Sequence, residues 1–223
     1  MTTSSMTRLG PDRHRTLTGL VYEYRSFAEL IAPLRNSDWT RETRCIGWQV
    51  RDVAAHVVGQ ATDMVSGTIG TRTPDDQATA LRGEFPAVLA TQLDIAVASI
   101  AQLATVLDDS AWRAPSPVPG LTLGQGIHAL LQDAHVHGDD VRAALGLSSD
   151  AGPGLYASLD FVLGALLRDA TARTEPALAR LLAVPARDFT QQTGIAAYDF
   201  LLAATGRADP APLRLPQSVN IFR

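Results

Sequence analysis

Apolar residues recur along the chain mainly at steps of three and four, and alternating segments typical of strands are scarce. This pattern predicts a mainly α protein. We expect four long amphipathic helices at about residues 13–34, 50–66, 86–107 and 122–146. The last of them begins at a T-x-x-Q capping box formed by Thr122 and Gln125. Four helices of comparable length predict a four-helix bundle.

A stretch rich in Gly, Ser and Pro, residues 146–154, indicates a linker after the bundle. We therefore predict a domain over residues 1–148 and a small, mostly helical C-terminal region over residues 149–223. In the second region we expect helices at about 155–173 and 195–205 and an edge strand at 219–222. About 70 residues is marginal for an independent core, so we expect this region to dock on the bundle. No internal repeat is apparent.

Composition and charge narrow the class of partner. The chain has 223 residues, a formal net charge of −4 and one cysteine, Cys45, which excludes an intrachain disulfide and a metal site built only from cysteines. No run of basic residues is present, so we expect neither a nucleic-acid nor a membrane partner. The N-terminal stretch lacks the apolar core of a signal peptide. We expect a cytoplasmic monomer or homodimer that acts on a small molecule.

The fourth predicted helix carries a group of polar residues beside its apolar stripe. On a helical wheel, Asp133, His137 and Asp140 lie within about 60° of one another on one flank of that stripe. His135 falls on the opposite flank, so it is not expected to share a site with His137. The remaining histidines are expected to be solvated surface residues: His14, His128 and His135.

The second predicted helix also places a histidine, His56, at the margin of its apolar stripe. If the two margins face each other, His56, Asp133 and His137 converge. Three such ligands with an open position are typical of a catalytic metal site. Asp140, one turn beyond His137, would then hydrogen-bond the imidazole from behind. The alternative is that these histidines are packed, hydrogen-bonded residues with no ion.

Three segments carry a family resemblance. Residues 45–59 read CIGWQVRDVAAHVVG, residues 133–146 read DAHVHGDDVRAALG, and residues 196–210 read AAYDFLLAATGRADP. The first resembles the Cys/Pro-Gly-Trp-Thr-Val-Arg-Asp-x-x-x-His signature of the mycothiol-dependent maleylpyruvate isomerase family, in the DinB-like superfamily. The second is similar to the family's Glu-x-x-x-His-x-x-Asp helix and the third to its Leu-x-x-Gly-Arg element.

The resemblance implies a DinB-like four-helix bundle with a divalent metal, usually zinc, on His56, Asp133 and His137. It also implies that a low-molecular-weight thiol, mycothiol in actinobacteria, acts as cosubstrate. Arg207 falls on the Gly-Arg position, where an arginine could hold a substrate carboxylate. All 19 basic residues are arginine, which fits a GC-rich actinobacterium.

Two departures from the family pattern bear on the metal site. Asp133 stands where the family has Glu and is one methylene shorter, so we expect closer helices or a bridging water. Gln49 stands where a Thr would cap the second helix, which weakens the cap by about 1 kcal/mol. We expect Cys45 to pack under Trp48, although a nucleophilic role is the alternative. The predicted function is a metal-dependent, thiol-using transferase or isomerase; the alternatives are a non-catalytic metal- or thiol-binding module and a decayed site.

Overall fold

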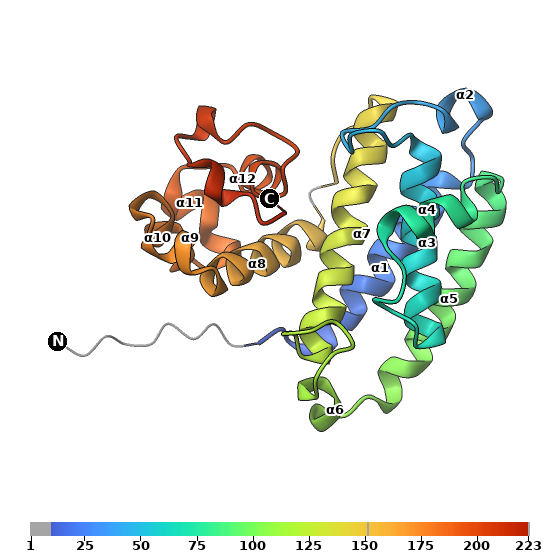
Figure 1. The fold of residues 1–223 in the computed structure, drawn as a ribbon, viewed down its shortest axis with the longest axis horizontal. Helices are drawn as coiled ribbons and strands as arrows, with labels where there is room; N and C mark the ends of the chain where they lie inside the picture. The colour runs from blue at the N-terminus through green and yellow to red at the C-terminus, as the bar shows by residue number, and fades with distance from the viewer. Residues whose placement is uncertain (1–9, 151, 223) are drawn as a thin grey trace. The chain divides into compact units, whose positions relative to one another are not determined.

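The computed structural model describes residues 10–150 and 152–222, and these residues contain helices and turns but no strand (Figure 1). The mainly α class predicted from the periodicity is therefore confirmed. The described residues form two compact units, an N-terminal unit, Pro11–Asp150, and a C-terminal unit, residues 152–222. The docking of the C-terminal region on the bundle stays a prediction.

Four long helices build the N-terminal unit: α1 (Arg13–Ile31), α3 (Val50–Ser66), α5 (Pro86–Val106) and α7 (Leu123–Leu145). Helices α1 and α3 each pack against both α5 and α7. Their apolar stripes meet in a core that includes the fully buried Leu20, Val53, Leu93 and Leu131. Three short helices complete the unit: α2 (Asn36–Trp39), α4 (Pro74–Leu81) and α6 (Asp109–Arg113).

The N-terminal unit contains an internal repeat, so the expectation that none exists was wrong. Five pairs of equivalent residues are each separated by 73 positions. Three pairs are helix starts, one is a pair of turn glycines and one a pair of buried tryptophans: Arg13 and Pro86, Asn36 and Asp109, Val50 and Leu123, Gly47 and Gly120, Trp39 and Trp112. Both glycines have a φ of 81°, a left-handed conformation that favours glycine. The packing of α1 on α7 is matched by that of α5 on α3. The repeat is carried by backbone geometry, which the differing side chains conceal in the sequence.

The helices that bear the predicted site begin at equivalent turns. At α7, the Thr122 hydroxyl accepts from the Gln125 amide at 3.2 Å and the Gln125 side chain accepts from the Thr122 amide at 2.9 Å, which confirms the capping box. At α3, the Asp52 side chain accepts from the Gln49 backbone amide at 2.9 Å, as Gln125 does from Thr122, but the Gln49 side chain makes no cap bond. Only one half of the capping box is therefore present at α3, where the charge of Asp52 in the first turn also interacts favourably with the helix dipole.

The C-terminal unit is a cluster of short helices around α8 (Pro153–Arg168). The others are α9 (Ala170–Thr174), α10 (Pro176–Leu182), α11 (Phe189–Thr193) and α12 (Ala197–Ala204), with 3₁₀ turns at Ala186–Asp188, Ala211–Leu213 and Gln217–Val219. Phe189 and Phe200 pack against each other in its core with tilted rings whose centroids are 4.7 Å apart. The edge strand expected at 219–222 was wrong: a 3₁₀ turn ends there, and the Ile221 amide donates to the Ala204 carbonyl at 3.0 Å. The described residues contain no strand with which this segment could pair.

Within the described residues, α5 is the one helix long and apolar enough to cross a membrane by length and composition. About a third of its most apolar window, 33%, is buried within the protein. Because α5 packs on α1 and α3, its apolar character also serves the core of the N-terminal unit.

Candidate metal centre

The structure brings His56 of α3 together with Asp133 and His137 of α7. Their nearest donor atoms all lie within 4.8 Å of one another. The Asp133 carboxylate is 3.3 Å from His56 Nε2 through one oxygen and 3.5 Å from His137 Nε2 through the other. Nitrogen and oxygen ligands at 2.0–2.2 Å from a tetrahedral ion are about 3.4 Å apart, so each of these two spacings is close to that of a ligand pair on such an ion.

The packing of α3 against α7 explains why the three side chains meet. Each lies at the margin of its helix's buried face, and His56 and His137 are 97% and 93% buried. The two rings stand edge to face with centroids 5.1 Å apart. The shorter carboxylate of Asp133 nevertheless reaches both rings directly, so no bridging water is needed.

Unsatisfied polar atoms support a cation at this position. The Oδ2 atom of Asp133 and the hydroxyl of Tyr24 are both buried and lack a hydrogen-bond partner among the described residues. A buried carboxylate oxygen without a donor is costly, and a cation held by the two imidazoles and Asp133 would compensate it. The donor set of two imidazoles and one carboxylate fits a borderline divalent ion such as zinc.

A polar relay behind His56 orients its ring. Asp63 is an acceptor-only carboxylate held by Arg72, and it accepts from Gln77 Nε2 at 2.7 Å. The amide oxygen of Gln77 therefore faces His56 Nδ1, at 2.8 Å, and that nitrogen must carry the hydrogen. This leaves the lone pair on Nε2, the atom that faces Asp133. Gln77 lies on α4, a short helix that was not among those expected from the sequence, so sequence reasoning missed it.

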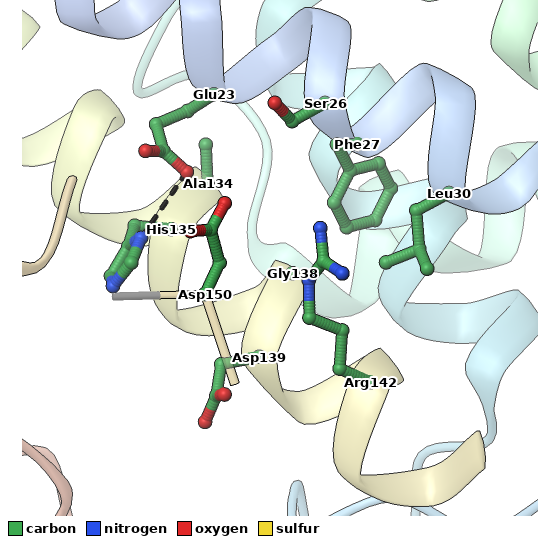
Figure 2. A pocket seen from close by; sticks show the side chains of 10 residues that line it. All are labelled: Glu23, Ser26, Phe27, Leu30, Ala134, His135, Gly138, Asp139, Arg142 and Asp150. Carbon is green, nitrogen blue, oxygen red and sulfur yellow. Dashed lines mark hydrogen bonds and ion pairs between the residues drawn. The ribbon is translucent and has the colours of Figure 1, made fainter. Parts of the chain in front are cut away.

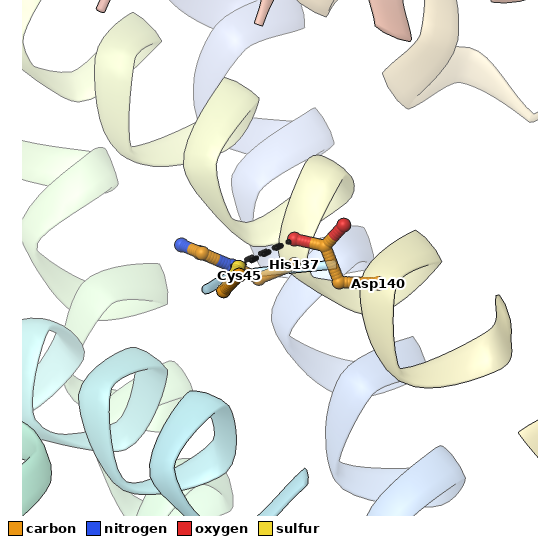
Figure 3. Close-up of side chains that lie close together, drawn as sticks. All are labelled: Cys45, His137 and Asp140. Carbon is orange, nitrogen blue, oxygen red and sulfur yellow. Dashed lines mark hydrogen bonds and ion pairs between the residues drawn. The ribbon is translucent and has the colours of Figure 1, made fainter. Parts of the chain in front are cut away.

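His137 is oriented by a charged partner. Its Nδ1 lies 3.1 Å from Asp140 Oδ2, the hydrogen bond expected for Asp140. Asp140 is fully buried and accepts from Arg44 Nε at 3.1 Å, and Arg44 also pairs with Asp139. The thiol of Cys45 donates to the same Asp140 oxygen at 3.2 Å (Figure 3). The loop before α3 is thus attached to α7 directly behind His137.

The charges in this cluster shift the pKa values of its members. Burial acts to raise the pKa of Asp133, but the positive charges of His137 and His56, when these rings are protonated, outweigh it and lower the pKa well below its ordinary value. Burial acts to lower the pKa of His137, but Asp133, Asp140 and Cys45 raise it well above its ordinary value. Burial, followed by the charge of Asp133, raises the pKa of Tyr24. Asp133 is therefore ionised at neutral pH and ready to bind a cation.

Trp48 forms an aromatic wall beside the two imidazoles. Its ring centroid lies 5.3 Å from that of His56 and 6.2 Å from that of His137, to which it is nearly parallel. The indole nitrogen donates to Asp75 on α4 at 3.0 Å, which holds the ring in place. A residue expected only to cover Cys45 therefore borders the candidate metal centre.

The opposite flank of α7 differs from the prediction. His135 and His128 are buried, so their expected solvent exposure was wrong, whereas His14 is exposed as expected. His135 Nδ1 pairs with Glu23 of α1 at 3.2 Å beside a small pocket (Figure 2). The helical wheel assumed one buried stripe on this helix, but α7 packs against α1 as well as α3, so two of its sides are buried.

Arg207 belongs to the C-terminal unit and follows α12. Its Nη1 donates to the Thr205 carbonyl at 2.8 Å. Its role in binding a substrate anion stays a prediction.

Comparison with known families identifies one family whose model spans these residues. The model of the mycothiol maleylpyruvate isomerase N-terminal domain matches residues 22–142, more than half of the chain. The chain belongs to this family. The residues that match the mycothiol maleylpyruvate isomerase domain include all three candidate ligands and most of the N-terminal unit. No curated protein and no solved structure matches the chain.

Proposed function

We propose that this protein is a metal-dependent enzyme that uses a low-molecular-weight thiol of the mycothiol type to attack a small electrophile, as a transferase or isomerase. The observation that carries the proposal is the convergence of His56, Asp133 and His137 around a carboxylate oxygen that is buried and lacks a hydrogen-bond partner. The family supplies the link to a thiol. A bound divalent cation, most suitably zinc, would stabilise the thiolate near neutral pH.

The protein's own residues would divide the remaining work. His56 and His137 present Nε2 because Gln77 and Asp140 bind the other ring nitrogens. Asp133 contributes the negative charge that balances the cation. Trp48 excludes water from one side of the imidazoles, which strengthens the electrostatic interactions there. Arg207 is proposed to bind an anionic group of the substrate.

The proposal includes a setting for this chemistry. We infer that the protein acts in the cytoplasm of an actinobacterium, as a monomer or homodimer, on a small-molecule substrate. Two facts support this setting: the family is described by its link to mycothiol, and the chain contains arginine but no lysine.

Elemental analysis of protein purified without chelators tests the metal. We expect about one divalent ion per chain and a rise in melting temperature when zinc is added to the metal-free protein. The variant His56→Ala should lose both, while His14→Ala, an exposed histidine, should lose neither. Absence of bound metal together with no response to zinc would refute the proposal.

A panel of thiols and electrophiles tests the reaction. Metal-loaded protein should accelerate the reaction of mycothiol with at least one of maleylpyruvate, an epoxide or a haloarene, and His56→Ala should not. Metal-loaded protein that is inactive on the whole panel would favour the non-catalytic module instead. If Asp133→Glu raises metal affinity, the site has partly decayed from the family's ligand set.

A further inference from the structure

A second group of donor atoms lies on the other side of His137 (Figure 3). The Cys45 sulfur is 3.2 Å from Asp140 Oδ2 and 3.7 Å from His137 Nδ1, and those two atoms are 3.1 Å apart. Sulfur at 2.3 Å and nitrogen or oxygen at 2.0–2.2 Å from a tetrahedral ion are separated by about 3.4–3.6 Å. Small shifts would therefore place all three atoms around one ion.

The chain holds each donor of this group in place. Arg44 occupies Oδ1 of the buried Asp140, which leaves Oδ2 directed at the thiol. The hydroxyl of Thr43 accepts the Cys45 amide at 3.2 Å and orients the loop that carries the thiol. Cys45 itself is partly exposed, so an ion can reach it.

We propose that Cys45, His137 and Asp140 form a second site, which binds a thiophilic divalent cation such as Cd²⁺ or excess Zn²⁺. The thiol releases its proton to solvent as the sulfur–metal bond forms. A thiolate makes this site softer than the two-imidazole, one-carboxylate group on the other side of the ring. The site does not depend on the proposed thiol chemistry.

Both sites draw on the same imidazole through different nitrogens. A neutral ring has one lone pair and one N–H, so an ion on Nδ1 requires the hydrogen to move to Nε2. Occupation of the second site therefore removes His137 from the first. A soft metal in excess acts as an antagonist of the ion bound by His56 and Asp133.

Cadmium titration of the metal-free, full-length protein tests the site through the ultraviolet thiolate-to-cadmium charge-transfer band. We expect a saturable band in the wild type and none in Cys45→Ser. In Asp140→Asn the affinity read from the band should fall at least about tenfold, because replacing an anionic ligand should cost no less than the roughly 10–100-fold lost with an outer-shell partner. Asp133→Ala should keep the band, because it leaves these three donors in place.

Two outcomes would overturn the second site. One is the absence of a band in the wild type. The other is a band whose cadmium affinity is as high in Asp140→Asn and in His137→Gln as in the wild type, because the thiol alone would then bind the ion. Failure of the proposed enzyme activity is distinguishable, because it would leave the band and its dependence on Asp140 unchanged.

Discussion

The first half of the N-terminal unit, residues 13–66, and the second, residues 86–139, follow the same order of long helix, short helix, glycine turn and long helix. Their chemistry differs at the positions that the 73-residue shift makes equivalent: His56 and Ala129, Gln60 and Asp133, Met64 and His137. One half supplies an imidazole and the other an imidazole and a carboxylate. The repeat thus provides two facing helices, and divergence of their side chains produces a single centre.

The two imidazoles also differ in what stands behind them. His56 is backed by the neutral amide of Gln77, and His137 by the carboxylate of Asp140. Gln77 lies on α4, a helix that packs on α3 and follows the first half of the repeat. A carboxylate makes its imidazole a stronger base than an amide does, so the two ligands are unequal.

Removing the carboxylate of the second half should have the largest effect. Asp133→Ala deletes the anionic donor, and we expect metal affinity to fall beyond the about 100-fold upper range for outer-shell losses. Gln60→Ala, at the equivalent position of the first half, should cost less than about tenfold. Isothermal titration of the metal-free variants with zinc measures both. Equal losses in the two variants would contradict the division of roles between the halves.

Cutting the two relays should give smaller, unequal losses. Asp140→Asn and Gln77→Ala each remove a partner of a ring nitrogen, and we expect about 10–100-fold weaker zinc binding. Asp140→Asn should be the more damaging, because it also removes a charge. Gln77→Glu keeps an acceptor for His56 but places a second carboxylate against Asp63, so it should recover only part of the affinity lost in Gln77→Ala. A larger loss of zinc affinity in Gln77→Ala than in Asp140→Asn would contradict the expectation that the partner of His137 matters more than the partner of His56.

The close packing of Gly124, in the first turn of α7, against Trp112 can be tested through the stability of the protein. A Cβ added at Gly124 would lie 2.3 Å from the Trp112 ring, whose nitrogen is bound to the Pro11 carbonyl. Gly124→Ala should therefore lower the free energy of unfolding by about 1–3 kcal/mol. Gly138→Ala on the same helix meets only Phe27, at 3.7 Å, and should be neutral or stabilising. Denaturant unfolding distinguishes them, and a tolerated Gly124→Ala would show that the first turn of α7 has room for a side chain, as the first turn of α3 has at the equivalent Arg51.

The caps of the two equivalent helices should respond differently. Thr122→Ala removes a hydroxyl that binds the helix backbone and should cost about 1 kcal/mol of stability. Gln49→Ala should cost less, because the Gln49 side chain makes no cap bond. Thermal unfolding of both variants checks this, and equal costs would mean that the two turns are capped alike.

The smallest effect concerns pH and a residue of the first half. Burial acts to raise the pKa of Asp63, but hydrogen bonds from Arg72, Gln77 and Thr68 lower it below its ordinary value. Its contribution to stability is present above the ordinary aspartate pKa of about 3.9 and is lost as pH falls through the lowered folded pKa. Asp63→Asn should flatten this acid-side slope in the melting temperature. Val136 is equivalent in the second half and gives no such slope.

Helical periodicity located the long helices and the candidate ligands from the sequence because both depend on one apolar stripe per helix. The wheel failed for His135, since α7 is buried on two sides. It also missed Gln77, although Thr73 followed by a proline signals the start of α4. The hydrogen bond from His56 Nδ1 to the Gln77 amide oxygen joins two helices, so the spacing of residues within one helix does not reveal it. The repeat escaped notice because it preserves backbone conformation and replaces side chains.

The position of Trp48 has an optical consequence. An indole about 5–6 Å from both imidazoles lies within range for quenching by an ion with an open d shell, whereas zinc, with a filled shell, lacks that effect. Cobalt binding should therefore dim the tryptophan emission and zinc should not, and Trp48→Phe should abolish the difference. The fluorescence of Trp48 should therefore report which metal ion is bound.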